Sequence, residues 1–307
     1  MDTLKIISII ECCIVTAAIC SSFYFLYILA TVPNLQLTCR PFLMLFNVSL
    51  FVLALTHGLK TVEYFFQVRH ADRSSFVFTE RFFVWSLIHE LAFAMHSISI
   101  LMFAIERYIT AKYHVVQNIR SHIIALFFSF ICICLSLAYT EVVHIFDFEL
   151  APITFMNTVD MIGILVLIFS SKYSISHYRQ TIGLIPLEAR FQISDVYMWT
   201  KAIVPIASSA FFVKFFFVVI SWMISINDAM LEYRVILIIT FQNALDIFTI
   251  VLPFALNAKH EKLKNMSFNY RKRAIQPELF VKSLEGKAIH MRATFHDHFN
   301  FLNKHWQ

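Results

Sequence analysis

The chain has 307 residues, of which 59% are hydrophobic and 15% are charged, and its formal net charge is +5. A soluble protein of this length could not bury so much apolar surface, which excludes the soluble globular classes. The excess positive charge comes from a basic C-terminal tail that follows the apolar part of the chain. Such a tail favours contact with anionic lipid or a cytosolic partner, so the charge does not indicate nucleic-acid binding.

Seven apolar runs follow one another along the chain. Each reaches or exceeds the roughly 20 residues that a helix needs to cross a hydrocarbon core about 30 Å thick. Helices are expected because lipid offers no partner to backbone amides, and the runs lack the alternation of a barrel. The sequence therefore predicts an all-α membrane protein, with a seven-transmembrane-helix domain at residues 1–257 and a basic cytosolic tail at residues 258–307. The runs are residues 6–32, 41–66, 82–111, 122–146, 152–171, 197–226 and 235–257.

The distribution of Lys and Arg predicts the orientation of these helices. With the N-terminus outside, the cytosolic segments hold 17 Lys and Arg residues and the outer segments hold five. The tail contributes ten of the 17, and the short loops alone still favour the same side by seven to five. Positive residues are enriched on the cytosolic side of membrane proteins. We therefore expect an outer N-terminus and a cytosolic C-terminus.

The third run ends in Glu106-Arg107-Tyr108, at its cytosolic boundary. An acid beside an arginine at that depth can hold the guanidinium in a resting state, and helix movement would release it to a partner. The alternative is an ordinary interfacial arginine that reaches lipid phosphate. We predict that these three residues form a coupling site.

Several segments resemble one receptor family. Residues 103–113, which contain Glu106-Arg107-Tyr108, look like the third-helix signature of the nematode serpentine chemoreceptors, class epsilon (Sre). Three other segments are also similar to that family. They are Arg190-Phe191-Gln192 before the sixth run, Leu252-Pro253-Phe254 in the seventh run, and the Trp-bearing C-terminus at residues 299–306. The resemblance implies a G-protein-coupled-type chemoreceptor in the plasma membrane of chemosensory neurons. It implies that a heterotrimeric G protein binds at Glu106 and Arg107. The sequence has no Gly-x-Ser-x-Gly element, Asp-Gly pair or phosphate loop, so we expect neither enzymatic activity nor a cofactor.

Polar residues inside the runs are the candidates for ligand binding, because each is costly in lipid unless it faces the bundle. Lys214 and Asp246 lie near the middle of neighbouring runs, which suggests a buried pair that restrains the sixth helix. The second run adds His57, Lys60 and Glu63. Each of these residues also has a structural explanation, such as a histidine that bonds a nearby carbonyl. The predicted site for an unidentified small molecule comprises His89, Glu90, His96, Lys214, Gln242 and Asp246.

Two other classes of function stay open. A seven-helix hydrolase would need a metal site from residues such as His57, His89, His96, Glu90, His144 and Asp160, but their spacing is not that of His-Glu-x-x-His. An odorant-gated channel would have its N-terminus inside, and a transporter would show repeats and broken helices. With only four glycines and no repeat, the chain favours the receptor. Pro205 and Pro253 could kink their helices, and the sequence leaves open whether either is a hinge.

Overall fold

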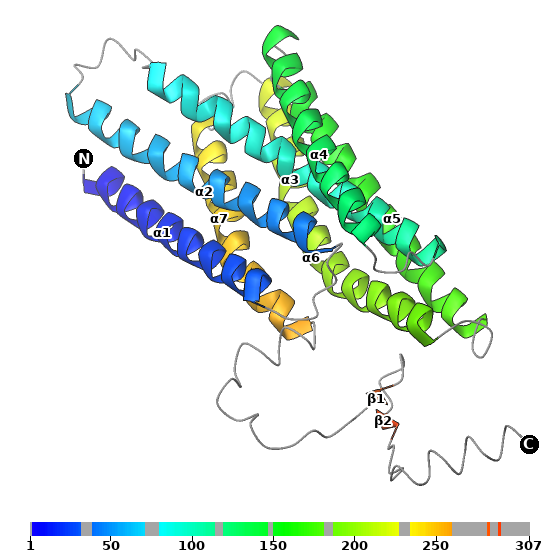
Figure 1. The fold of residues 1–307 in the computed structure, drawn as a ribbon. Helices are drawn as coiled ribbons and strands as arrows, with labels where there is room; N and C mark the ends of the chain where they lie inside the picture. The colour runs from blue at the N-terminus through cyan, green and yellow to red at the C-terminus, as the bar shows by residue number, and fades with distance from the viewer. Residues whose placement is uncertain are drawn as a thin grey trace, which may run out of the picture. The chain divides into compact units, whose positions relative to one another are not determined.

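The computed structural model describes residues 2–31, 39–70, 80–113, 119–146, 150–180, 187–226, 234–259, 281–282 and 288–289. Within these ranges it contains seven helices that are long and apolar enough to cross a membrane, which confirms the predicted seven-helix membrane fold (Figure 1). The helices are α1 (Asp2–Thr31), α2 (Cys39–His70), α3 (Glu80–Tyr113), α4 (Ile119–Phe146), α5 (Ala151–Gln180), α6 (Leu187–Ile226) and α7 (Arg234–Lys259).

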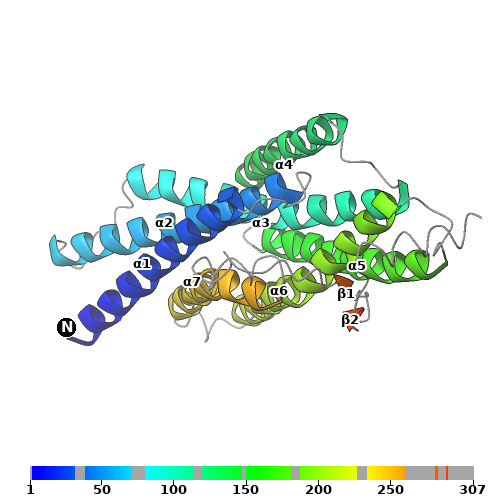
Figure 2. The same ribbon diagram turned by 60° about the horizontal axis from the view of Figure 1, so that its bottom comes forward.

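Successive helices run in opposite directions through the bundle (Figure 1). We call the end at which α1, α3, α5 and α7 begin the N-terminal end, and the other the C-terminal end. The central helix is α3, which packs against α2, α4, α5 and α6. The helix α1 packs on α2 and α7, whereas α4 lies at the edge of the bundle (Figure 2). Large side chains on the outer face of α4, such as Leu126, Phe127 and Phe130, are more than half exposed and suit a lipid environment.

All seven helices are longer than their apolar runs, and two of them, α5 and α6, extend furthest beyond them. The run at residues 152–171 ends before α5, which continues to Gln180, and the run at residues 197–226 begins after the start of α6 at Leu187, so most of the segment between the two runs is helical. Hydropathy marks the residues that lie in hydrocarbon, but backbone hydrogen bonds continue through the polar residues that follow. Sequence composition therefore located the crossing segments but not the ends of the helices.

Gly163 permits a close approach between α3 and α5. A Cβ atom added to Gly163 on α5 would lie 3.3 Å from Cγ2 of Ile100 and 3.4 Å from the backbone of Leu101 on α3. A similar contact joins α2 to α1, where a Cβ atom on Gly58 would lie 2.8 Å from Cγ1 of Val15. Small residues at such crossings let membrane helices approach closely enough for van der Waals contact.

The proline in α7 is compensated by a side chain from α1. Pro253 lacks an N–H group, so the carbonyl of Thr249, four residues earlier, receives no hydrogen bond from its own helix. The hydroxyl of Ser21 on α1 lies 3.3 Å from that carbonyl and 3.0 Å from the carbonyl of Ile250. Nearby, Nδ2 of Asn47 on α2 donates to the carbonyl of Ser22 at 2.9 Å. These bonds hold α1, α2 and α7 together at the position where α7 is weakest.

The remaining part of the chain is a separate unit, Ser267–Gln307. Its described residues form two short antiparallel strands, β1 (Val281–Lys282) and β2 (Ala288–Ile289), in which Val281 pairs with Ile289. The other predicted features of the tail, including its Trp-bearing end, lie outside the described residues.

Candidate functional site

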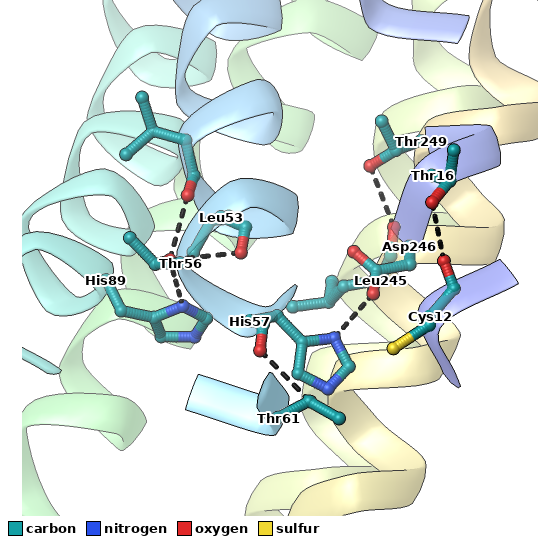
Figure 3. A network of polar contacts seen from close by, with 11 residues as sticks. Cys12, Thr16, Leu53, Thr56, His57, Thr61, His89, Leu245, Asp246 and Thr249 are labelled. Carbon is teal, nitrogen blue, oxygen red and sulfur yellow. Dashed lines mark hydrogen bonds and ion pairs between the residues drawn. The ribbon is translucent and has the colours of Figure 1, made fainter. Parts of the chain in front are cut away.

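A polar cluster joins α2, α3 and α7 in the N-terminal half of the bundle (Figure 3). Nδ1 of His57 on α2 lies 2.6 Å from Oδ2 of Asp246 on α7, and both side chains are about 97% buried. One residue earlier on α2, the hydroxyl of Thr56 lies 2.8 Å from Nδ1 of His89 on α3. Two neighbouring residues of α2 thus reach the helices on either side of it.

Thr56 lies between the backbone of its own helix and His89. Its hydroxyl oxygen lies 2.8 and 3.0 Å from the carbonyls of Val52 and Leu53, and 2.8 Å from Nδ1 of His89. Figure 3 shows that the Nε2 atoms of His89 and His57 point the same way, toward the Thr61 end of α2.

A second cluster joins α3, α5 and α6 around Lys214. Nζ of Lys214 donates to Oδ2 of Asp160 on α5 at 2.8 Å and to the hydroxyl of Ser97 on α3 at 2.9 Å. It also lies 4.7 Å from the centre of the Phe93 ring, within the range of a cation–π contact. The ammonium group is fully enclosed, since Lys214 is 1% exposed.

The suggested pair between Lys214 and Asp246 is therefore wrong. Both residues lie near the middle of their helices, but Lys214 faces α3 and α5, and Asp246 faces α2. A shift of one residue turns a helical side chain by about 100°, so depth in the membrane does not determine which neighbour a residue meets. Lys214 pairs with Asp160 in place of Asp246, and Asp246 pairs with His57.

Other predicted ligand-binding residues lie apart from one another. His96 is 0% exposed and packs between Phe46 and Phe248, with ring centres 4.6 and 6.5 Å away. Glu90 lies near Lys60 and Tyr139, on the side of α3 that faces α2 and α4. Gln242 is partly exposed on α7. The structure thus places His89 and Asp246 in one cluster and Lys214 in another, with His96 buried apart from both sets of hydrogen bonds.

An apolar cavity lies farther toward the C-terminal end, between α2, α3, α6 and α7. The space that a water-sized sphere can occupy in it is only about 30 Å³. Ser99 contributes a hydroxyl, but this hydroxyl donates to the carbonyl of His96 at 2.8 Å, so the exposed lining is apolar. Side chains that line the cavity include Phe42, Phe46, Phe103, Ile206 and Leu252.

Arg107 lies one helical turn beyond this cavity and is 0% exposed. Its Nε and Nη2 atoms donate to the two carboxylate oxygens of Glu106 at 2.5 and 2.6 Å, and Thr110 donates to the same carboxylate at 2.9 Å. The guanidinium also lies 5.6 Å from the centre of the Phe103 ring. Asp195 on α6 is close enough to interact electrostatically with the guanidinium, which connects α3 to α6 at this end.

Tyr108 faces away from this pair. Its ring packs against Phe169 and Tyr173 of α5, with centres 5.7 and 6.0 Å away. The predicted coupling triplet therefore divides between two faces of α3, because consecutive residues on a helix point about 100° apart. Tyr108 fixes α3 against α5, whereas Glu106 and Arg107 lie toward the interior.

Sequence reasoning missed the two partners that define the clusters. It considered His57 and Asp160 only as members of larger groups, and nothing in their spacing signals which helix each one faces. Among the described residues, no three His, Cys, Asp or Glu side chains are placed to hold a metal ion.

The two clusters and the Glu106–Arg107 pair hold charged groups in the low-dielectric core of the bundle. Movement of the helices would change which of these groups pair. No protein-family model matches the chain, and no curated protein matches its sequence.

Proposed function

We propose that this protein is a chemosensory G-protein-coupled-type receptor of the plasma membrane. In this proposal the N-terminal end of the bundle is outside and binds a small molecule, and the C-terminal end contacts a heterotrimeric G protein. The observation that carries the proposal is the fully buried Arg107, held by Glu106 at the C-terminal end of the central helix. A buried arginine held by Glu106 beside it and attracted by Asp195 on α6 is an arrangement that helix movement can open.

The helix α6 supplies a route between the two ends. Lys214 in its middle binds α3 and α5, and Asp195 near its start interacts with Arg107. A ligand that moves α6 relative to α3 would change both contacts. The ligand needs only to bind the open arrangement more tightly than the closed one, because it shifts an existing equilibrium.

Signalling variants test this proposal without knowledge of the ligand. Glu106→Gln keeps the shape of the side chain but removes the charge that holds Arg107, so ligand-independent signalling should rise in cells that express a panel of G proteins. Adding Arg107→Ala to Glu106→Gln should return the signal to background. Lys112→Ala, which removes an exposed cation from the same helix, is the matched control and should have no effect.

Surface expression must be equal for all variants, as measured with an N-terminal tag on intact cells. The same stain reports orientation, because the proposal requires the N-terminal tag outside and a C-terminal tag visible only after permeabilisation. A reversed topology, or a double variant that signals as strongly as Glu106→Gln, would refute the receptor mechanism. A reversed topology would favour the odorant-gated channel.

A further inference from the structure

His96 on α3 is a fully enclosed polar side chain that forms no hydrogen bond with the described part of the chain. It is 0% exposed, and neither Nδ1 nor Nε2 of its ring has a partner there. By contrast, His57 and His89 each bond a residue of a neighbouring helix. Within the described ranges, His96 is also the one side chain in which two polar atoms are both enclosed and unpaired.

Aromatic rings and one cation surround the imidazole. The centre of the Phe46 ring on α2 lies 4.6 Å from that of His96, and the centre of the Phe248 ring on α7 lies 6.5 Å away. Lys214 on α6 is close enough to interact electrostatically, although its own hydrogen bonds go to α3 and α5. A second positive charge beside this ammonium is unfavourable, so the imidazole is neutral, with one donor and one acceptor to satisfy.

The apolar cavity begins one turn farther along the same face of α3. Ser99 and Ile100, three and four residues after His96, line this cavity, and Phe46 both lines it and packs on the imidazole. The hydroxyl of Ser99 is already bonded to the carbonyl of His96. A cavity of about 30 Å³ with an apolar lining gives a water molecule too few partners. It therefore does not provide the imidazole with a partner in this arrangement.

The unpaired imidazole raises the free energy of the arrangement that encloses it. Its cost corresponds to roughly a fivefold to 150-fold change in the equilibrium between two arrangements. Side chains of α6 form one wall of the cavity, at Ile203, Ile206 and Ala207. Movement of α6 away from α3 would widen the cavity, and water that entered it would find a donor and an acceptor on the imidazole.

We infer that His96 is a conformational switch: it destabilises the closed arrangement of the bundle and is paired by water in the open one. This inference rests on the proposed function and names a device that sets how readily the receptor opens. His96 lies about three helical turns before Arg107 on α3, so it acts through the arrangement of the helices and not by contact with the guanidinium. An apolar side chain at this position would keep the contacts with Phe46 and Phe248 and remove the cost of the closed arrangement.

Thermal unfolding of the purified full-length protein in lipid nanodiscs tests this cost. His96→Phe and His96→Leu should raise the midpoint by about 2–4 °C, and the smaller leucine covers the case in which a phenyl ring is too large. His96→Gln keeps a polar group and should not exceed the wild type. His57→Leu is the matched control: it removes a buried histidine that has a partner, Asp246, and should lower the midpoint.

The rate at which a cysteine in the cavity wall reacts with a water-soluble methanethiosulfonate reports opening without a G protein. Ala207→Cys provides this cysteine on α6, and the labelling of the natural cysteines is subtracted. Adding His96→Leu should slow the labelling about fivefold or more, whereas adding His96→Gln should not. Lys112→Cys, at an exposed position of α3, should react equally fast in every variant.

Signalling connects the switch to the receptor. In a Glu106→Gln background, adding His96→Leu should lower ligand-independent signalling about fivefold or more at equal surface expression, and adding His96→Gln should leave it high. A residue with only a structural role would raise the midpoint without slowing the labelling or lowering the signal.

The inference is overturned if both apolar variants fail to raise the midpoint, if His96→Gln raises it as much as His96→Leu, or if His96→Leu leaves the labelling rate unchanged. Unfolding and labelling need no G protein, so the expected midpoints and labelling rates in a chain that never signals would refute the receptor proposal alone. Signalling by Glu106→Gln that His96→Leu does not lower would refute this inference alone.

Discussion

Lys214 on α6 donates to Asp160 on α5 at 2.8 Å, in a position where neither side chain is more than 3% exposed. The same ammonium reaches Ser97 on α3, so a single group links three helices. In a low-dielectric interior each charge depends on the other, because removing one leaves its partner buried and uncompensated.

We expect Lys214→Met to lower the free energy of unfolding by about 3–5 kcal/mol, because it leaves Asp160 charged and unpaired. The double variant Lys214→Met/Asp160→Leu should recover most of this loss, since it removes both charges and keeps apolar volume. Thermal unfolding in nanodiscs measures both. Lys201→Met, an exposed lysine on the same helix, serves as the control. Equal effects at Lys214 and Lys201 would contradict a structural ion pair.

Under the proposed function, the same variant should also signal without ligand. Lys214→Met removes the bonds that hold α6 against α3 and α5, and therefore favours the arrangement in which α6 has moved. A G-protein reporter in cells with matched surface expression should show basal activity above that of wild type and of Lys201→Met. Basal activity at the wild-type level would mean that this contact does not restrain the inactive state.

Ser21→Ala should cost about 1 kcal/mol of stability, because it removes the donor that the Pro253 position makes necessary. A double-mutant cycle tests whether this cost arises from the missing N–H group of Pro253. In a Pro253→Ala background the restored N–H can bond the Thr249 carbonyl, so the cost of Ser21→Ala should become smaller. Ser209→Ala, whose hydroxyl bonds the Ile206 carbonyl within α6, is the control for losing a hydroxyl. If Ser21→Ala costs the same stability in both backgrounds, the Ser21 hydrogen bond does not compensate for Pro253.

Gly163→Leu should destabilise the bundle by about 1–3 kcal/mol, because the new side chain would meet the backbone of α3 at Leu101. The neighbouring Ile162 is 44% exposed, so Ile162→Leu should change the unfolding midpoint very little. Thermal unfolding of the two variants in the same nanodiscs gives the comparison. Similar midpoints would show that α5 can move away from α3 without cost.

The sequence predicted the positions of the seven helices. It did not predict where α5 ends and α6 begins, or which charged side chains pair between helices. Apolar runs located all seven crossings because the requirement of about 20 apolar residues is local. The run at residues 152–171 stopped before the end of α5, since the polar turn that follows it leaves the hydrocarbon while remaining helical. Glu106 and Arg107 were identified together because they are adjacent and their contact needs no information about other helices.

The sequence by itself determined that the chain is a bundle of seven apolar helices with rare internal charges, because hydropathy is a sum over neighbouring residues. Only the tertiary structure decided that His57 meets Asp246 and that Lys214 meets Asp160. Those pairs depend on the rotation of each helix about its axis and on which helices are neighbours. Both are set by packing around α3, including the close contact at Gly163. Rotating a helix by the equivalent of one residue, about 100°, gives each side chain a different neighbour. Spacing along the chain therefore cannot predict which residues pair.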